Sequence, residues 1–91
     1  MIYLSDYTIS YEPWWDRFFE KFDSSVQERV WKKIQQLKQG LRHRHLKHGL
    51  PYFVEEAGGY RIVFEVFETQ KIKKVCFVGD HKQYEKWFSS V

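Results

Sequence analysis

Three apolar runs in the last third of the chain are separated by very short turns. The runs cover residues 52–56, 60–68 and 71–78, and the turns are Ala57-Gly58-Gly59 and Thr69-Gln70. Connections this short join antiparallel strands, because parallel strands need a crossover of a dozen or more residues. The spacing therefore predicts an antiparallel meander, which needs other elements to cover at least one of its faces.

The first half of the chain is predicted to supply that cover. Alternating apolar residues predict a short strand within residues 6–12, and aromatic residues at spacings of three and four predict a helix over 13–22. Ser25 and Glu28 have the spacing of a capping box, which would open a second helix that ends at Gly40. The two helices would form a helical hairpin.

A short terminal helix completes the predicted fold, with Tyr84, Trp87 and Phe88 on one face. The order of elements predicts an α+β fold, β-α-α-β-β-β followed by the terminal helix. Its mainly antiparallel four-stranded sheet is covered on one side by the helical hairpin. Residues 1–91 are expected to form a single domain.

Composition excludes a disordered chain, because 43% of the residues are hydrophobic and 20% are aromatic. The single cysteine, Cys76, has no partner for an internal disulfide and is expected to be a small buried residue in a reducing compartment. No apolar run approaches the roughly 20 residues of a membrane span, and the N-terminus lacks a leader pattern. We therefore expect a soluble, cytoplasmic protein without membrane contact.

Positive charge is concentrated in one segment. Residues 29–48 contain no acidic residue and seven cations: Arg29, Lys32, Lys33, Lys38, Arg42, Arg44 and Lys47. Such a segment attracts a polyanion, and Arg42, Arg44 and Lys47 are candidate phosphate contacts. The alternative is a solvated surface, which suits Lys32, Lys33 and Lys38 on the predicted helix.

The strand at 60–68 is apolar on both faces, but only one face is wholly apolar. Ile62, Phe64 and Val66 are assigned to the side covered by the helices. Arg61 then lies with Val63 and Phe67 on the opposite, open face. An open face with arginine and aromatic residues, beside a cationic loop, suits single-stranded RNA, whose bases stack on flat groups.

Three histidines in the loop, His43, His45 and His48, raise the question of a metal. Their spacing matches no standard zinc pattern, no cysteine lies nearby, and the cations between them oppose metal binding. We expect no metal and no cofactor.

Three local motifs, in order along the chain, resemble those of the RelE/ParE superfamily of toxins from type II toxin–antitoxin systems. The first resembles the family's Leu-Lys-Gly turn, the second its Gly-x-Tyr-Arg-Ile strand, and the third its Val-Gly ending followed by a basic residue and an aromatic. In this chain they are Leu46-Lys47-His48-Gly49, Gly59-Tyr60-Arg61-Ile62-Val63-Phe64 and Val78-Gly79-Asp80-His81-Lys82-Gln83-Tyr84. The histidine places the chain nearer the YafQ-like members, since plain RelE has an arginine near this point.

The resemblance implies a ribosome-dependent messenger RNA endonuclease that works by metal-independent acid–base chemistry. It implies that Arg61 binds the phosphate, His81 transfers a proton, and Tyr84 stacks a base or shares in proton transfer. It also implies a histidine from the loop, for which His48 is preferred over His43 and His45, and it makes Lys82 a further RNA contact. Each assignment has a structural alternative: an ion pair of Arg61 with Glu65, a capping or surface role for His81, and packing of the last helix by Tyr84.

Other functions share this fold. ParE-like relatives act on DNA gyrase without the acid–base set, and His81 after Gly79 argues against that branch. A third reading is a nucleic-acid-binding module without catalysis. The resemblance also implies an antitoxin partner, with operator DNA as a further ligand of the pair, and one of Trp14 and Trp15 is expected to be exposed for that partner unless the helix is fully buried.

Overall fold

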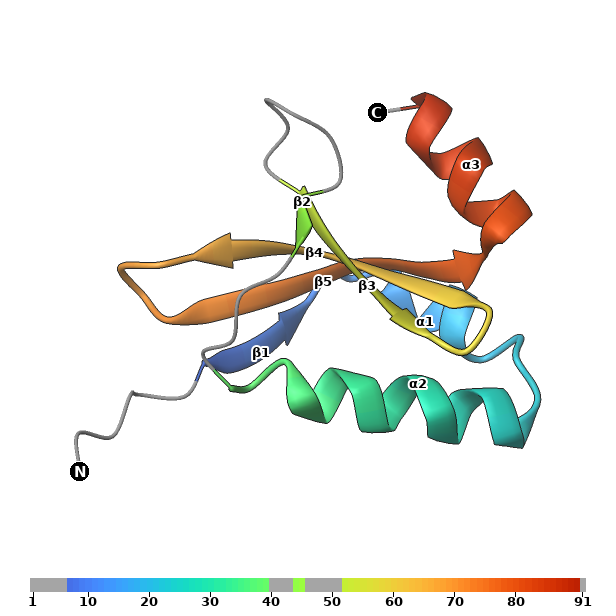
Figure 1. The fold of residues 1–91 in the computed structure, drawn as a ribbon, viewed down its shortest axis with the longest axis horizontal. Helices are drawn as coiled ribbons and strands as arrows, with labels where there is room; N and C mark the ends of the chain where they lie inside the picture. The colour runs from blue at the N-terminus through green and yellow to red at the C-terminus, as the bar shows by residue number, and fades with distance from the viewer. Residues whose placement is uncertain (1–6, 40–43, 46–51, 91) are drawn as a thin grey trace.

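The protein is described by a computed structural model that covers residues 7–39, 44–45 and 52–90, with the backbone alone at 44–45. Its centre is a five-stranded sheet in the order β1-β5-β4-β3-β2 (Figure 1). The strands are β1 Thr8–Tyr11, β2 Arg44–His45, β3 Tyr52–Ala57, β4 Tyr60–Phe67 and β5 Ile72–Asp80. β1 runs parallel to β5 and the other pairs are antiparallel, so the four expected strands and the α+β class are confirmed. The two-residue β2 adds a short strand outside β3, within a segment that was expected to be a loop.

Three helices flank this sheet: α1 Trp15–Phe19, α2 Ser24–Gln36 and α3 His81–Ser90. Figure 1 shows α2 along one side of the sheet, whereas α3 begins at the end of β5 and rises on the other side. The described helices are all too short or too polar to cross a membrane.

The first helix is shorter than the predicted range of 13–22. α1 has five residues and lies beside the second half of β5, where β1 has already ended. Its side chains divide between the two faces: Trp15 and Phe19 pack toward the core beneath α2, and Phe18 packs toward the opposite core. Trp14 is 46% exposed, which confirms that one of the adjacent tryptophans remains at the surface.

The cap of α2 differs from the predicted capping box. Asp23 is the N-cap residue, and its Oδ1 accepts a hydrogen bond of 3.0 Å from the backbone N–H of Val26. The Ser25 hydroxyl donates to the same carboxylate, and Glu28 forms an ion pair with Lys32 at 3.1 Å. An aspartate immediately before the first helical residue satisfies a free N–H group, so Ser25 lies inside the helix and the pair Ser25 and Glu28 is not a cap.

The main core lies between α2 and the sheet. Its buried residues from α2 are Val26, Val30 and Ile34, followed by Leu37 just after the helix, and they face Ile62 and Phe64 of β4 together with Val75 and Val78 of β5. Val66 packs against the same cluster. The assignment of Ile62, Phe64 and Val66 to the helix-covered face is therefore confirmed.

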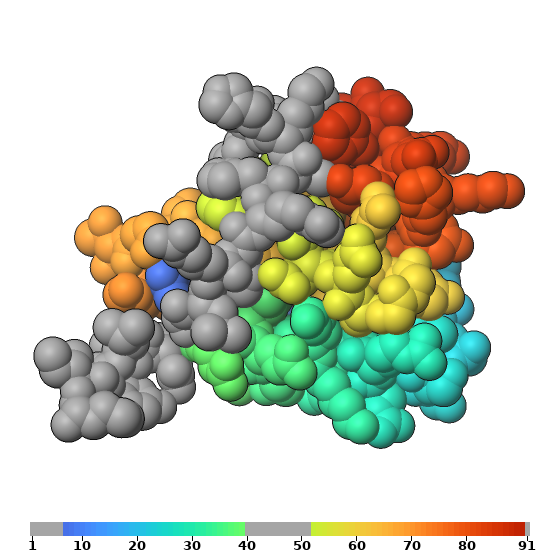
Figure 2. All heavy atoms as spheres, in the orientation of Figure 1, coloured from blue at the N-terminus to red at the C-terminus, as the bar shows by residue number. Residues whose placement is uncertain are grey.

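The opposite face is not open, which corrects the expectation from the sequence. Val63 is fully buried there in a second core with Val54, Phe77 and Tyr84, and Trp87 and Phe88 of α3 pack against it. Figure 2 shows atoms of α3 directly beside those of the β3–β4 hairpin. The aromatic stripe of α3 has too much apolar area to leave in water, so the helix folds back on the sheet.

The pairing of β4 with β5 contains one β-bulge. Val63 pairs with Phe77 and Phe64 pairs with Val75, so Cys76 is the extra residue in β5. A bulge increases local twist and redirects the side chains after it. Here it separates Val75, in the α2 core, from Phe77, in the α3 core.

Candidate functional site

The candidate site lies where β5 ends and α3 begins. Arg61 of β4 is the register partner of Gly79 in β5, and His81 follows Gly79 by two residues as the first residue of α3. Arg61 and His81, which are 20 positions apart in the sequence, are thus delivered to the same end of the sheet. Both are next to Tyr84, Arg61 across the strand–helix interface and His81 one helical turn earlier.

The guanidinium of Arg61 lies between an aromatic ring and a carboxylate. Its Cζ is 4.6 Å from the centroid of the Tyr84 ring, and its Nε is 3.7 Å from Oε1 of Glu56. The alternative ion pair with Glu65 is not formed among the described residues. The Arg61 side chain is 29% exposed, so the group is held from one side and reaches solvent from the other.

The Tyr84 ring contacts Arg61 from the side of the second core. Its side chain is buried in the second core, with only 9% of the residue exposed, and its ring centroid is 6.0 Å from that of Phe88. Tyr84 therefore packs the last helix onto the sheet, and its part in base stacking or proton transfer stays a prediction.

His81 is exposed and has an acidic neighbour. Its side chain is 62% exposed, and its Nε2 lies 2.9 Å from Oε1 of Glu85, one helical turn later. A neutral imidazole that donates from Nε2 retains Nδ1 as its basic nitrogen. The Glu85 carboxylate therefore helps to orient the ring, and the i,i+4 spacing of the two residues in the sequence could have suggested this contact.

The start of α3 is fixed by two reciprocal hydrogen bonds. The Asp80 backbone N–H donates to Oε1 of Gln83, and the Gln83 backbone N–H donates to Oδ1 of Asp80, both at 2.8 Å. This is a capping box, and its Asp-x-x-Gln spacing is visible in the sequence. It stabilises the first turn of α3, which contains His81.

Gly79 allows the chain to fold back at this point. A Cβ atom there would lie 2.6 Å from Cζ of Phe77 and 2.8 Å from Cβ of Gln83. Both distances are too short for carbon atoms, so a side chain at position 79 would push α3 away from the sheet. Steric crowding therefore explains why glycine is required at position 79, two residues before His81.

The remaining predicted site residues are only partly described. Arg42, His43, Lys47 and His48 lie outside the described residues. Arg44 and His45 form β2, where they pair with Val54 and Phe53 of β3. Lys82 is exposed on α3 and has no ion-pair partner among the residues that the structure covers.

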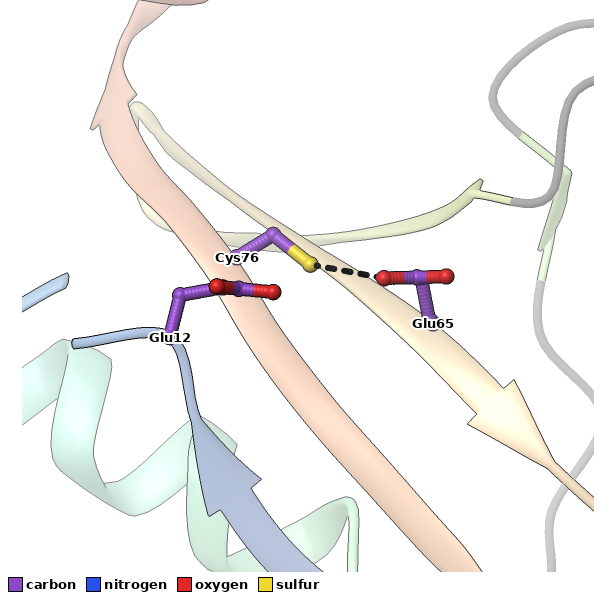
Figure 3. Close-up of side chains that lie close together, drawn as sticks. All are labelled: Glu12, Glu65 and Cys76. Carbon is purple, nitrogen blue, oxygen red and sulfur yellow. Dashed lines mark hydrogen bonds between the residues drawn. The ribbon is translucent and has the colours of Figure 1, made fainter. Parts of the chain in front are cut away.

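A polar cluster surrounds Cys76 on the sheet (Figure 3). Ligand atoms of Glu12, Glu65 and Cys76 lie within 4.8 Å of one another, the one such group found in the described part of the chain. The Cys76 thiol donates to Oε1 of Glu65 over 3.7 Å, and Lys74 Nζ lies 2.6 Å from Oε1 of Glu12. Burial, with the nearby carboxylates, raises the pKa of the Cys76 thiol to about 12. The thiol is therefore a protonated donor at neutral pH, and the Lys74 ammonium group pairs with Glu12, so the thiol and both carboxylates each have a partner within the protein.

Comparison with known proteins identifies the architecture. Neither family models nor curated protein sequences give a match. Among solved structures, a chain of the toxin–antitoxin complex RelBE2 from Mycobacterium tuberculosis superposes with a TM-score of 0.75 and 16% identity, over 87% of this chain and 95% of that one. The chain has the RelE fold.

Two further structures support this RelE fold. An Escherichia coli RelE mutant in complex with a RelB peptide has a TM-score of 0.73 and 21% identity, over 94% of this chain and 95% of that one. A chain of the RelB–RelE complex from Methanococcus jannaschii has a TM-score of 0.69 and 16% identity, over 87% and 98% of the two chains. At these identities the comparison shows a shared fold across nearly the whole domain.

Proposed function

We propose that this protein is the toxin of a type II toxin–antitoxin pair and that it cleaves messenger RNA on the ribosome. The observation that carries the proposal is the delivery of Arg61 and His81 to one end of the sheet, through the pairing of Arg61 with Gly79. The RelE fold supports it, because the solved relatives are toxins found with RelB antitoxins.

In the proposed reaction the 2′-hydroxyl of one nucleotide attacks the adjacent phosphorus. A base takes the 2′ proton as the new O–P bond forms, and an acid protonates the 5′-oxygen as the old P–O bond breaks. The products are a cyclic phosphate and a 5′-hydroxyl. This chemistry needs a positive group that stabilises the pentacoordinate phosphorus, and one or two groups that transfer protons.

Arg61 is assigned to the phosphate. A guanidinium stays charged at all working pH values and offers a planar pair of donors to two phosphate oxygens. The Tyr84 ring, at 4.6 Å, holds the guanidinium in place. The Glu56 carboxylate is 3.7 Å from Nε, which is longer than a good hydrogen bond, so a phosphate can replace it as the partner of Arg61.

His81 is assigned to proton transfer, since imidazole gives and takes protons near neutral pH. Its exposure leaves room for RNA, and its Nε2 contacts Glu85, so Nδ1 is the nitrogen assigned to the proton transfer. Glu85 is a positioning residue in this scheme. His48 from the loop is the second proton-transfer candidate.

The cationic residues are assigned to the RNA backbone. Lys82 lies next to His81 on α3, and β2 places the backbone of Arg44 beside β3. Arg42 and Lys47, with Arg44 and Lys82, complete the proposed set of phosphate contacts. The partners in this scheme are a cognate antitoxin, messenger RNA in the ribosomal A site, and operator DNA through the antitoxin complex, all in the cytoplasm.

The test is to map messenger cleavage after adding purified protein to translating ribosomes. Codon-positioned cuts are expected with the wild type and are expected to fall by about 10²–10⁴-fold in His81→Ala and Arg61→Ala. Arg17→Ala, an exposed arginine on α1, is the matched control and should cut normally. Intact message combined with inhibition of gyrase supercoiling would instead establish the ParE-like function.

A further inference from the structure

A groove of about 370 Å³ lies between α1 and α3, apart from the Arg61 and His81 side of the helix. Its apolar walls are Phe18 from α1, Phe77 from β5 and Trp87 from α3. Lys21 and Lys86 line it as well. We refer to it as the α1–α3 groove. Its volume falls within the range of pockets that hold small ligands.

The aromatic walls are held in fixed positions. The Phe77 and Trp87 rings are stacked, with centroids 5.3 Å apart and planes 15° apart, and Phe18 meets Phe77 edge-on at 5.1 Å. Trp87 also contacts Tyr52 of β3 at 5.3 Å. Phe77 is only 2% exposed, so the aromatic surface open to a ligand comes from Phe18 and Trp87, which are partly buried. Their positions are fixed before binding, which lowers the entropic cost of holding a flat ligand.

The charge in the groove is uniformly positive. Lys21 and Lys86 have no ion-pair partner within the described part of the chain, whereas Lys32, Lys33 and Lys74 each contact a glutamate. No acidic residue lines the groove. Gln83, another lining residue, uses its carbonyl oxygen for the helix cap, which leaves its amide N–H groups as donors. An aromatic surface with two unpaired cations and an amide donor fits a flat group that carries an anion.

We propose that the α1–α3 groove binds one base of a single-stranded nucleic acid, with the adjoining phosphates on Lys21 and Lys86. A nucleotide combines a flat face and an attached anion in one unit, and base stacking on aromatic side chains is the usual means of holding single strands. The proposal rests on the proposed function for the identity of the strand as RNA. Trp87 lies six residues after His81 on the same helix, about 9 Å along its axis and on a different face, so one strand would have to pass around α3 to reach both places.

The binding test uses a strand that cannot be cut. A short oligodeoxynucleotide lacks the attacking 2′-hydroxyl, and the same length of deoxyribose phosphates without bases serves as its partner probe. The protein has four tryptophans, so its four indole N–H signals report on binding by nuclear magnetic resonance. The Trp87 signal should shift and saturate with the base-bearing strand, while those of the exposed Trp14 and Trp31 should stay in place.

Two charge reversals at exposed lysines provide matched variants. Lys86→Glu should weaken binding of the base-bearing strand about tenfold at low salt, because it removes one phosphate contact and adds repulsion. Lys71→Glu, at the tip of the β4–β5 hairpin at the other end of the sheet (Figure 1), should change it less than about twofold. Loss of the bases should weaken binding about tenfold or more.

Several results would overturn the inference. Equal affinity for the strand without bases, or equal loss in both lysine variants, would show unspecific attraction only. A Trp87 signal that shifts with an acidic peptide but not with the oligonucleotide would identify the groove as a protein-docking site. The outcome is separable from the proposed nuclease, because binding is measured on a strand that cannot be cut. Message cleavage without any Trp87 shift would refute the groove alone, and a Trp87 shift without message cleavage would refute the nuclease alone.

Discussion

The guanidinium carbon of Arg61 lies 4.6 Å from the centre of the Tyr84 ring, so the sheet and the terminal helix meet through a cation–π contact. This contact places a charged group on the surface while its supporting ring is buried. It means that the position of the proposed phosphate-binding residue depends on the packing of α3.

Tyr84 is therefore expected to act through its ring. Tyr84→Ala should lower the free energy of unfolding by about 3–5 kcal/mol, because it leaves a cavity above Val63 and Phe77. Tyr84→Phe keeps the ring and should cost no more than about 1.5 kcal/mol in urea denaturation. Messenger cleavage should survive in Tyr84→Phe. Loss of cleavage in a stable Tyr84→Phe protein would show that the hydroxyl takes part in the reaction.

Glu85 should matter to the rate but not to the fold. Both members of the pair with His81 are more than half exposed, so Glu85→Gln should change stability by less than about 1 kcal/mol. The cleavage rate should fall about tenfold, because the ring is no longer oriented by a carboxylate. The rate is measured by single-turnover cleavage on ribosome complexes. A Glu85→Gln protein as active as the wild type would show that the pair is only a surface contact.

Gly79 and Gly59 provide a matched pair of substitutions. Gly79→Ala would place a Cβ 2.6 Å from the Phe77 ring, whereas a Cβ at Gly59 would have no heavy atom within 4 Å. Gly79→Ala should therefore destabilise the protein by about 1–3 kcal/mol, and Gly59→Ala should be close to neutral. Thermal unfolding of the two variants measures the difference. Equal stability of both would mean that α3 moves freely away from Gly79.

Cys76 should make stability fall at high pH. Its pKa is raised from 9.0 to about 12 in the folded protein, so between these values the folded state holds a proton that the unfolded state has lost. Unfolding then releases a proton, and stability decreases by up to about 1.4 kcal/mol per pH unit as the pH rises above 9. The full contribution is present below pH 9.

Cys76→Ala isolates this effect from the other groups that titrate in the same range. The difference in unfolding free energy between the wild type and Cys76→Ala should shrink as the pH is raised from 8 to 11. The buried thiol should also resist alkylation in the folded protein at pH 8. Rapid alkylation under native conditions would contradict the protonated, buried state.

Most of the fold could be predicted from residues close together in the sequence, such as turn and cap residues. Gly58 was expected at the β3–β4 turn, and it has φ +62° there, at a point where a side chain would also collide with Arg29. The cap of α2 is Asp23 and not the predicted Ser25, because two neighbouring residues can satisfy the same N–H groups. The cap formed by Asp80 and Gln83 is equally local, since its two residues are three positions apart.

The sequence by itself determined the order of the helices and of all strands except β2, the turns, and the side of β4 that faces α2, because alternation and turn residues act over a few neighbours. Only the tertiary structure decided that α3 covers the opposite face, that Arg61 pairs with Glu56 rather than Glu65, and that Cys76 forms a bulge. These features depend on register and on burial between segments far apart in the chain, where the gain from covering aromatic surface outweighs any local preference.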